Sequence, residues 1–251
     1  MMMKKLFLFL TVVVLGISLS SCLTGGKQRF SEVAIVYIEQ SDLPPYSTYG
    51  KTHSGNGITN PKIELMQPGT FKMFYYLWEE DFGTTAIGNG TLLNVEISGE
   101  IVDINRTMLE PGYGSIETER GTPFKAIGSP IYDQKGVWFK DYWVFQYSYN
   151  GKEGQTPNVK FSLREEEGEN SSGTKLLNVD MRLNLVGEPK EGATSKELTS
   201  TIAVDMRHIR DSFLRNKDDR VEVKFYYYNT EEGEITSSQN NWPMVYFSAE
   251  Q

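Results

Sequence analysis

Cys22 is the side chain whose type and surroundings point most directly to covalent chemistry in this chain of 251 residues. It is the only cysteine, and it directly follows an apolar stretch and the short sequence Leu-Ser-Ser. A cysteine thiolate is a nucleophile that accepts a lipid or reacts with an oxidant. We therefore weigh lipid attachment at Cys22 against a free thiol inside an ordinary signal or membrane helix.

The residues before Cys22 favour lipid attachment. Two lysines precede an apolar stretch of 14 residues, which is shorter than the roughly 20 apolar residues that span a bilayer and is typical of a signal peptide. The apolar residue, two small residues and cysteine at 19–22 resemble the bacterial lipobox. That resemblance implies a signal peptide over residues 1–21, cleavage between Ser21 and Cys22, and acyl chains such as palmitate on Cys22.

Residues 22–28 contain two glycines and a threonine, and they are typical of a flexible tether. Lipid on Cys22 predicts anchoring at the outer membrane of a Gram-negative cell. No acidic residue directly follows Cys22. Acidic runs at that position resemble the surface-export signal of some Gram-negative lipoproteins, so their absence favours the periplasmic face over the cell surface.

The formal charge of the chain is −8, and removal of residues 1–21 takes away two lysines and changes it to −10. This acidity argues against nucleic acid as a partner and against electrostatic binding to anionic lipid. The mature chain has no cysteine left for a disulfide or a thiolate metal site, so its stability must come from core burial.

Residues with catalytic or metal-binding chemistry are few and poorly spaced. The two histidines, His53 and His208, are far apart in sequence, whereas a zinc site needs three or four ligands. The serine in residues 112–117 lacks the pattern of a nucleophile elbow. The three glutamates at 165–167 are typical of a solvated loop, although a carboxylate-based hydrolase stays as an alternative. We expect no metal, no cofactor and no catalytic residue.

The elements of the chain are predicted to be strands. Residues 33–38 form an apolar run, residues 71–78 are dense in aromatic side chains, and residues 176–186 alternate strictly between apolar and polar. Residues 92–108 also alternate, with a glycine that predicts a bulge. Residues 42–70, rich in Pro, Gly, Ser, Thr and Asn, are predicted to be a long loop.

The pattern divides the chain into two predicted domains. Residues 110–130 carry many glycines and prolines and no long periodic segment, which places a boundary near residue 120. Residues 29–118 are expected to form a small β-barrel with bent strands. Residues 122–251 are expected to form a β-sandwich of about six to eight strands. The fold class is therefore all-β.

Aromatic side chains occur on both faces of two predicted strands. Such rings either fill the core, where a second sheet and a neighbouring domain cover them, or form an exposed face that stacks sugars or anchors a protein. The candidate binding rings are Tyr147, Tyr149, Tyr226 and Tyr228.

The order of these elements resembles the NigD-like lipoproteins. A lipobox and a barrel-like region precede the segment SPIYDQKGVWFKDYWVFQYSY, the alternating strand LLNVDMRLNL, the segment TIAVDM and the strand VEVKFYYYNTEEGE. The resemblance implies an N-terminal OB-like barrel followed by an immunoglobulin-like β-sandwich. It also implies a link to bacteriocin immunity, and it transfers no functional residue beyond the lipidated cysteine.

We therefore expect a non-enzymatic envelope lipoprotein that is held to the membrane by lipid on Cys22 and binds a protein or a glycan through a β surface. One alternative is an immunity-like or envelope-assembly protein that sequesters one specific protein partner. The second alternative is the carboxylate-based hydrolase, which requires a cleft with two facing carboxylates.

Overall fold

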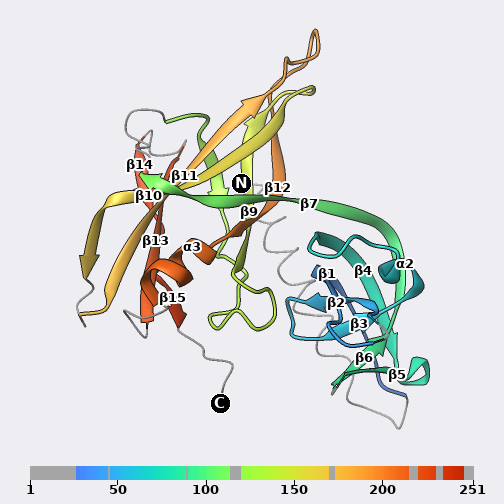
Figure 1. Ribbon diagram of the computed structural model, residues 1–251. Coiled ribbons are helices and arrows are strands. Elements are labelled where there is room, and N and C mark those ends of the chain that lie inside the picture. The colour runs from blue at the N-terminus through green and yellow to red at the C-terminus, as the bar shows by residue number, and fades with distance from the viewer. Residues whose placement is uncertain are drawn as a thin grey trace.

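The chain folds almost entirely into β-strands, as predicted. The structure, a computed structural model, describes residues 27–44, 46–88, 90–113, 120–169, 173–214, 220–229 and 234–245. Within these ranges two lobes lie at the two ends of one long strand, β7 (Figure 1). We call the part formed by β1 to β6 and the first half of β7 the N-lobe, and the remainder the C-lobe.

The elements of the N-lobe are short except for three strands. They are β1 (Arg29–Gln40), β2 (Thr48–Thr52), β3 (Gly57–Thr59), α2 (Pro61–Glu64), β4 (Phe71–Glu79), η1 (Glu80–Phe82), β5 (Thr84–Ile87), β6 (Gly90–Asn94) and β7 (Glu96–Tyr113). Those of the C-lobe are β8 (Phe124–Ile127), β9 (Tyr142–Gly151), β10 (Thr156–Glu169), β11 (Lys175–Val186), β12 (Lys196–Asp205), α3 (Arg207–Ile209), η2 (Arg210–Leu214), β13 (Arg220–Tyr228), β14 (Ile235–Ser237) and β15 (Trp242–Val245).

The N-lobe is one curved sheet in the order β7-β4-β1-β2-β3-β6-β5. Alternation along β1 explains its core: Ala34, Val36 and Ile38 point inward against Phe74 and Tyr76 of β4. The sheet is not closed on itself, so the predicted small barrel is incomplete. The arrangement of strands is still consistent with an OB-like domain.

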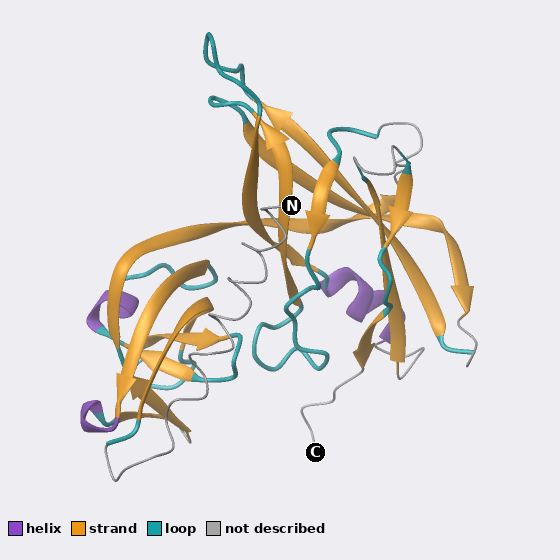
Figure 2. Ribbon diagram, turned by 180° about the vertical axis from the view of Figure 1, so that it is seen from behind, coloured by secondary structure: helices purple, strands orange, loops and turns teal. Residues whose placement is uncertain are grey.

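Strand β7 belongs to both lobes, which is clear in both ribbon views (Figures 1 and 2). Its first half pairs with β4 from Glu96 to Ile104, and its second half pairs with β12 and β10. The register with β4 shifts around Gly99, whose φ of 76° is left-handed. The predicted bulge in this strand is therefore confirmed.

The C-lobe is a sandwich whose two sheets both start at β7. One sheet continues through β12, β9 and β8, and the other through β10, β11 and β13 to β14 and β15. The alternating strand β11 places Leu177, Val179, Met181 and Leu183 in the core between the sheets, as its period of two predicts.

Two segments predicted as loops contain regular elements. The segment 42–70 contains β2, β3 and α2, and the acidic segment 165–169 continues β10. The stretch 136–141 is a turn-rich loop before β9. The domain boundary near residue 120 stays a prediction, because residues 114–119 lie outside the described residues.

The two lobes share a hydrophobic cluster, which we call the interlobe cluster. It joins Ile35, Tyr37, Phe71 and Ile104 of the N-lobe to Phe139, Val144 and Ala203 of the C-lobe. The ring of Phe71 meets that of Phe139 edge to face, with 5.4 Å between centroids. Since such aromatic pairs each stabilise by about 0.5–1.5 kcal/mol beyond area burial, the cluster fixes one lobe against the other.

Candidate functional site: the interlobe groove

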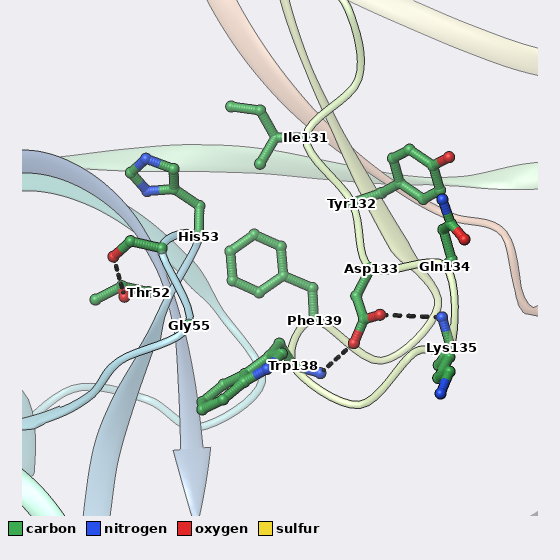
Figure 3. Close-up of a pocket in the computed structure, with 11 residues that line it drawn as sticks. Thr52, His53, Gly55, Ile131, Tyr132, Asp133, Gln134, Lys135, Trp138 and Phe139 are labelled. Atoms are coloured by element: carbon green, nitrogen blue, oxygen red, sulfur yellow. Dashed lines mark hydrogen bonds between the residues drawn. The ribbon is translucent and has the colours of Figure 1, made fainter. Parts of the chain in front are cut away.

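A cavity of about 470 Å³ lies beside the interlobe cluster, with one wall from each lobe. The N-lobe wall is the turn between β2 and β3, and the C-lobe wall is the loop that precedes β9 (Figure 3). Its lining side chains are Thr52, His53, Ser54, Gly55, Ile131, Tyr132, Asp133, Gln134, Lys135, Trp138 and Phe139. We call the cavity the interlobe groove and residues 131–141 the groove loop.

Asp133 organises the groove loop. Its Oδ2 accepts a hydrogen bond from the backbone N–H of Val137 at 2.7 Å. Figure 3 shows two more, from the N–H of Trp138 to Oδ2 at 2.9 Å and from that of Lys135 to Oδ1 at 3.0 Å. A carboxylate that accepts several backbone N–H groups holds a turn in one conformation. The role of Asp133 is therefore to position the loop.

The backbone of the groove loop requires two left-handed residues. Gly136 has φ of 72°, and a Cβ on it would lie 3.0 Å from the carbonyl oxygen of Lys140. Lys140 itself has φ of 54°, a conformation that costs a non-glycine residue about 1–2 kcal/mol. Such strain persists only where surrounding contacts hold the backbone in place.

Two cations hold the loop from outside. Arg210 forms an ion pair with Asp141 and donates to the carbonyl oxygens of Val245 at 2.8 Å and Gln134 at 3.3 Å. Lys51 of β2 donates to the carbonyl oxygen of Val137 at 3.3 Å. The loop is thus fixed to both lobes.

The fixed loop exposes two apolar side chains. Val137 is 47% exposed and Trp138 is 39% exposed. The Trp138 ring lies beside Gly55 of the opposite wall, where a Cβ would be 3.9 Å from the ring, and the Lys51 ammonium lies 5.9 Å from its centroid. Exposed aromatic side chains held rigidly in a groove are typical anchors for a ligand.

The N-lobe wall supplies polar groups. His53 Nδ1 accepts a hydrogen bond from the backbone N–H of Ile35 at 3.3 Å, so in the neutral ring the proton is on Nε2, which remains a donor. Ser54 donates to Glu32 at 2.7 Å, and Glu32 also accepts from Tyr76 at 2.6 Å. These bonds fix the turn that faces Trp138.

Glu39 connects the N-lobe to the groove loop through its charge. Its carboxylate is paired with Lys51 at 2.5 Å and Lys140 at 3.4 Å, and it accepts a hydrogen bond from Tyr49 at 2.8 Å. Burial opposes its charged form, but the hydrogen bonds from Lys51 and Tyr49 and the two positive charges lower its pKa overall. Glu39 therefore stays ionised and links β1 to β2 and to the groove loop.

Tyr132 closes the C-lobe end of the groove. Its ring stacks on Trp143 with centroids 4.1 Å apart, and burial raises the pKa of its hydroxyl to about 12. The hydroxyl therefore stays protonated at neutral pH and can donate a hydrogen bond.

The predicted tyrosine surface is wrong for two of its four members. Tyr147 and Tyr149 are each only 3% exposed and belong to the core between the two sheets of the C-lobe. The other face of β9 is covered in part, because Val144 belongs to the interlobe cluster. The rings of β9 thus fill the core, and its other face is covered at Val144 and Ser148 but exposed at Gln146 and Asn150.

Tyr226 and Tyr228 lie half-buried on the outer face of β13, because Val223 and Phe225 point to the core. The Arg164 guanidinium covers the Tyr226 ring at 4.4 Å, and the Arg120 guanidinium lies 5.7 Å from the Tyr228 ring. These cation–π contacts occupy the rings in part. Their role in binding stays a prediction.

The remaining predicted site residues are spread over the fold. Ser21 and Cys22 lie outside the described residues. His53 lines the groove, whereas His208 lies in α3 next to Ser212 at 3.4 Å. Within the described ranges, no three His, Asp or Glu side chains come together as a metal site, and no helix is long and apolar enough to cross a membrane.

A second cavity, of about 290 Å³, opens between the two sheets of the C-lobe near Phe145, Phe225 and Trp242. It lies over the sandwich core and is smaller than the interlobe groove. The interlobe groove is therefore the stronger candidate for a functional site.

Sequence reasoning missed the groove because its walls lie roughly 80 residues apart in the chain. One local signal was present: valine and tryptophan follow a glycine in the segment Asp-Gln-Lys-Gly-Val-Trp. A glycine between polar residues and an apolar pair marks a turn, and a turn there would place Trp138 in a loop.

Three solved structures share this arrangement of elements over most of their length. A protein of unknown function from Bacteroides vulgatus matches with a TM-score of 0.54 and 13% identity, over 88% of this chain and 93% of that one. A proposed lipoprotein from Bacteroides fragilis matches with a TM-score of 0.51 and 12% identity, over 89% and 100%. A NigD-like immunity protein from Bacteroides caccae matches with a TM-score of 0.50 and 13% identity, over 86% and 96%.

The chain has the NigD-like fold. The resemblance predicted from the order of elements is therefore confirmed at the level of the fold. No family model matches the chain, and no curated protein is significantly similar to it in sequence. The three structural relatives are named as a NigD-like immunity protein, a proposed lipoprotein and a protein of unknown function, and none of these names describes an enzyme.

Proposed function

We propose that this chain is a lipid-anchored protein of the bacterial cell envelope that binds a ligand in the interlobe groove without transforming it. The observation that carries this proposal is the groove loop, in which Asp133 and Arg210 fix a strained backbone so that Val137 and Trp138 face solvent. A rigid loop lowers the entropic cost of binding, which is the usual reason to fix exposed anchors in advance.

The single carboxylate in the described lining of the groove favours a binding role over hydrolysis. Asp133, the carboxylate among the described lining residues, is occupied by three backbone N–H groups. A carboxylate-based hydrolase requires two facing carboxylates that can exchange protons with a substrate. The described groove offers a positioning carboxylate in place of that pair.

The envelope location is supported by the lipobox around Cys22 and by the fold that the chain shares with a proposed lipoprotein. Acyl chains on Cys22 would hold the protein at the outer membrane, since each buried methylene contributes about 0.8 kcal/mol. The absence of an acidic run after Cys22 favours the periplasmic face.

A second candidate function is sequestration of one protein partner. It is favoured by the name of the structural relative from Bacteroides caccae, an immunity protein with the same fold. In this case Val137 and Trp138 would form the centre of a protein interface.

The test is a binding screen with the full lipidated chain against envelope glycans and envelope proteins, with the variants Trp138→Ala and Leu65→Ala in parallel. Leu65 is 90% exposed after α2, away from the groove, so it is a matched surface control. The proposal is supported when a ligand is lost with Trp138→Ala and retained with Leu65→Ala. Ligands that bind Trp138→Ala as well as the wild type would contradict it.

A further inference from the structure

We infer that the ligand of the interlobe groove is a neutral carbohydrate, bound by about one or two sugar rings against Trp138. This inference rests on the proposed function and names the chemical class of its ligand. It is argued from the size of the groove, the pairing of its charges and the type of its exposed groups.

The size of the groove favours a small ligand. Its volume of about 470 Å³ lies in the usual range for small-molecule sites, about 300–1,000 Å³. A stable protein interface instead covers about 800 Å² on each partner and places its central residues on a broad surface. Trp138 lines this cavity and lies next to Gly55 of the opposite wall, which favours a ligand small enough to enter it over a broad protein surface.

The charges around the groove are paired with one another. Glu39 is paired with Lys51 and Lys140, and Arg210 is paired with Asp141. These pairs lie outside the described lining of the groove, and Asp133, the carboxylate within it, already accepts three backbone N–H groups. The lining therefore favours a neutral ligand over a charged one. Lys135, the lysine among the described lining residues, is exposed, and water screens its charge.

The exposed groups match the two kinds of surface that a sugar presents. A pyranose ring has a face of C–H groups, which packs on the face of an aromatic ring such as Trp138. Its hydroxyls need both donors and acceptors. His53 offers a donor at Nε2 because Nδ1 is engaged by Ile35, and the side-chain amide of Gln134 offers both.

The experiment uses the full lipidated chain in a zwitterionic detergent, because detergents with sugar headgroups would compete for the groove. The probes are an array of neutral oligosaccharides and, beside them, sialylated and sulfated ones. The strongest neutral binder is then titrated by calorimetry against the wild type and the variants Trp138→Ala, Trp138→Leu, Trp138→Phe and Leu65→Ala.

We expect neutral oligosaccharides to bind the wild type and to lose about tenfold or more in affinity with Trp138→Ala and with Trp138→Leu, because leucine restores apolar bulk without a flat ring. Trp138→Phe keeps a ring, so its affinity should stay within about threefold of the wild type. Leu65→Ala should bind as the wild type does. This set of results supports the carbohydrate site.

Two results overturn it. One is the absence of neutral oligosaccharide binding at millimolar concentration, and the other is binding of the anionic probes alone. If a protein ligand is then found that is lost with Trp138→Ala, the proposed function stands and only the ligand class is wrong. If no ligand of either class depends on Trp138, both are wrong.

Discussion

Glu39 of β1 and Lys140 of the groove loop face each other across the two lobes, with 3.4 Å between Oε1 and Nζ. The same carboxylate is paired with Lys51 and accepts a hydrogen bond from Tyr49. Lys51 in turn donates to the carbonyl oxygen of Val137. One ionised side chain thus connects the sheet of the N-lobe to the loop that carries the exposed apolar pair.

Glu39→Gln should lower the free energy of unfolding by about 1–2 kcal/mol. The reason is that a hydrogen bond to a charged, partly buried group stabilises a protein more than an exposed ion pair does. The amide keeps the shape of the side chain and removes its charge. The measurement is urea-induced unfolding at neutral pH. A change below about 0.5 kcal/mol would show that Glu39 adds no more than an ordinary surface residue.

The same carboxylate predicts a dependence of stability on pH. The pKa of Glu39 in the folded protein is lowered from its ordinary value of 4.5, so its stabilising contribution is complete above that value and is lost as the pH falls through the lowered pKa. We expect Glu39→Gln to lose less stability than the wild type on acidification below pH 4.5. Thermal unfolding of both proteins from about pH 7 to pH 3 measures the difference, and parallel curves would refute it.

Phe139→Ala should make the two lobes unfold less cooperatively with each other. Phe139 is fully buried in the interlobe cluster and meets Phe71 edge to face, and loss of a buried phenylalanine ring costs about 3–5 kcal/mol. Because the ring joins the lobes, calorimetry should show a lower and broader transition. Leu65→Ala, on the exposed side of the N-lobe, should stay within about 0.5 kcal/mol of the wild type.

The strands that the sequence predicts best are those with one covered face. Strand β11 buries Leu177, Val179 and Met181 on one side. The alternation of apolar and polar residues in its sequence therefore predicts both the strand and its buried face. The short strands β2, β3 and β5 escaped prediction because each has five residues or fewer, too few to show a period. Pairing with neighbours, and not local preference, makes them strands.

The aromatic residues show where sequence reasoning about the site ends. Tyr147 and Tyr149 belong to a strand rich in aromatic residues, as a ligand-binding strand can be. Their rings are nevertheless buried in the sandwich core, and Val144 on the other face of β9 packs against the N-lobe. Periodicity identifies the two faces of a strand and leaves open what covers each face. Trp138, only nine positions before Tyr147, is exposed because Asp133 and Gly136 turn the chain away from both sheets.

Asp133→Ala should loosen the groove loop. Three backbone N–H groups lose their acceptor, and the exposed position of the loop lets water replace it at a cost of about 1–2 kcal/mol. We expect the amides of Val137 and Trp138 to exchange with solvent at least about tenfold faster. Hydrogen exchange followed by mass spectrometry measures this, with the amides of β11 as an internal control. Unchanged exchange at both amides would mean that Arg210 and Lys51 suffice to hold the loop.

Cys22→Ala should convert the membrane-bound protein into a water-soluble one. The lipobox places the acceptor thiol directly after two small residues, and the acyl chains on it would supply the membrane affinity, at about 0.8 kcal/mol for each buried methylene. In cells fed an alkyne fatty acid, the wild type should carry the label and partition into detergent, whereas Cys22→Ala should do neither.

The matched control for this experiment is Ser20→Ala, which keeps a small side chain at the lipobox and should be labelled as the wild type is. Protease added to intact cells and then to permeabilised cells distinguishes the two faces of the outer membrane. Protection until permeabilisation would agree with the absence of an acidic run after Cys22. A Cys22→Ala protein that still partitions into detergent would show that another segment holds the chain at the membrane, because the variant has no thiol left to acylate.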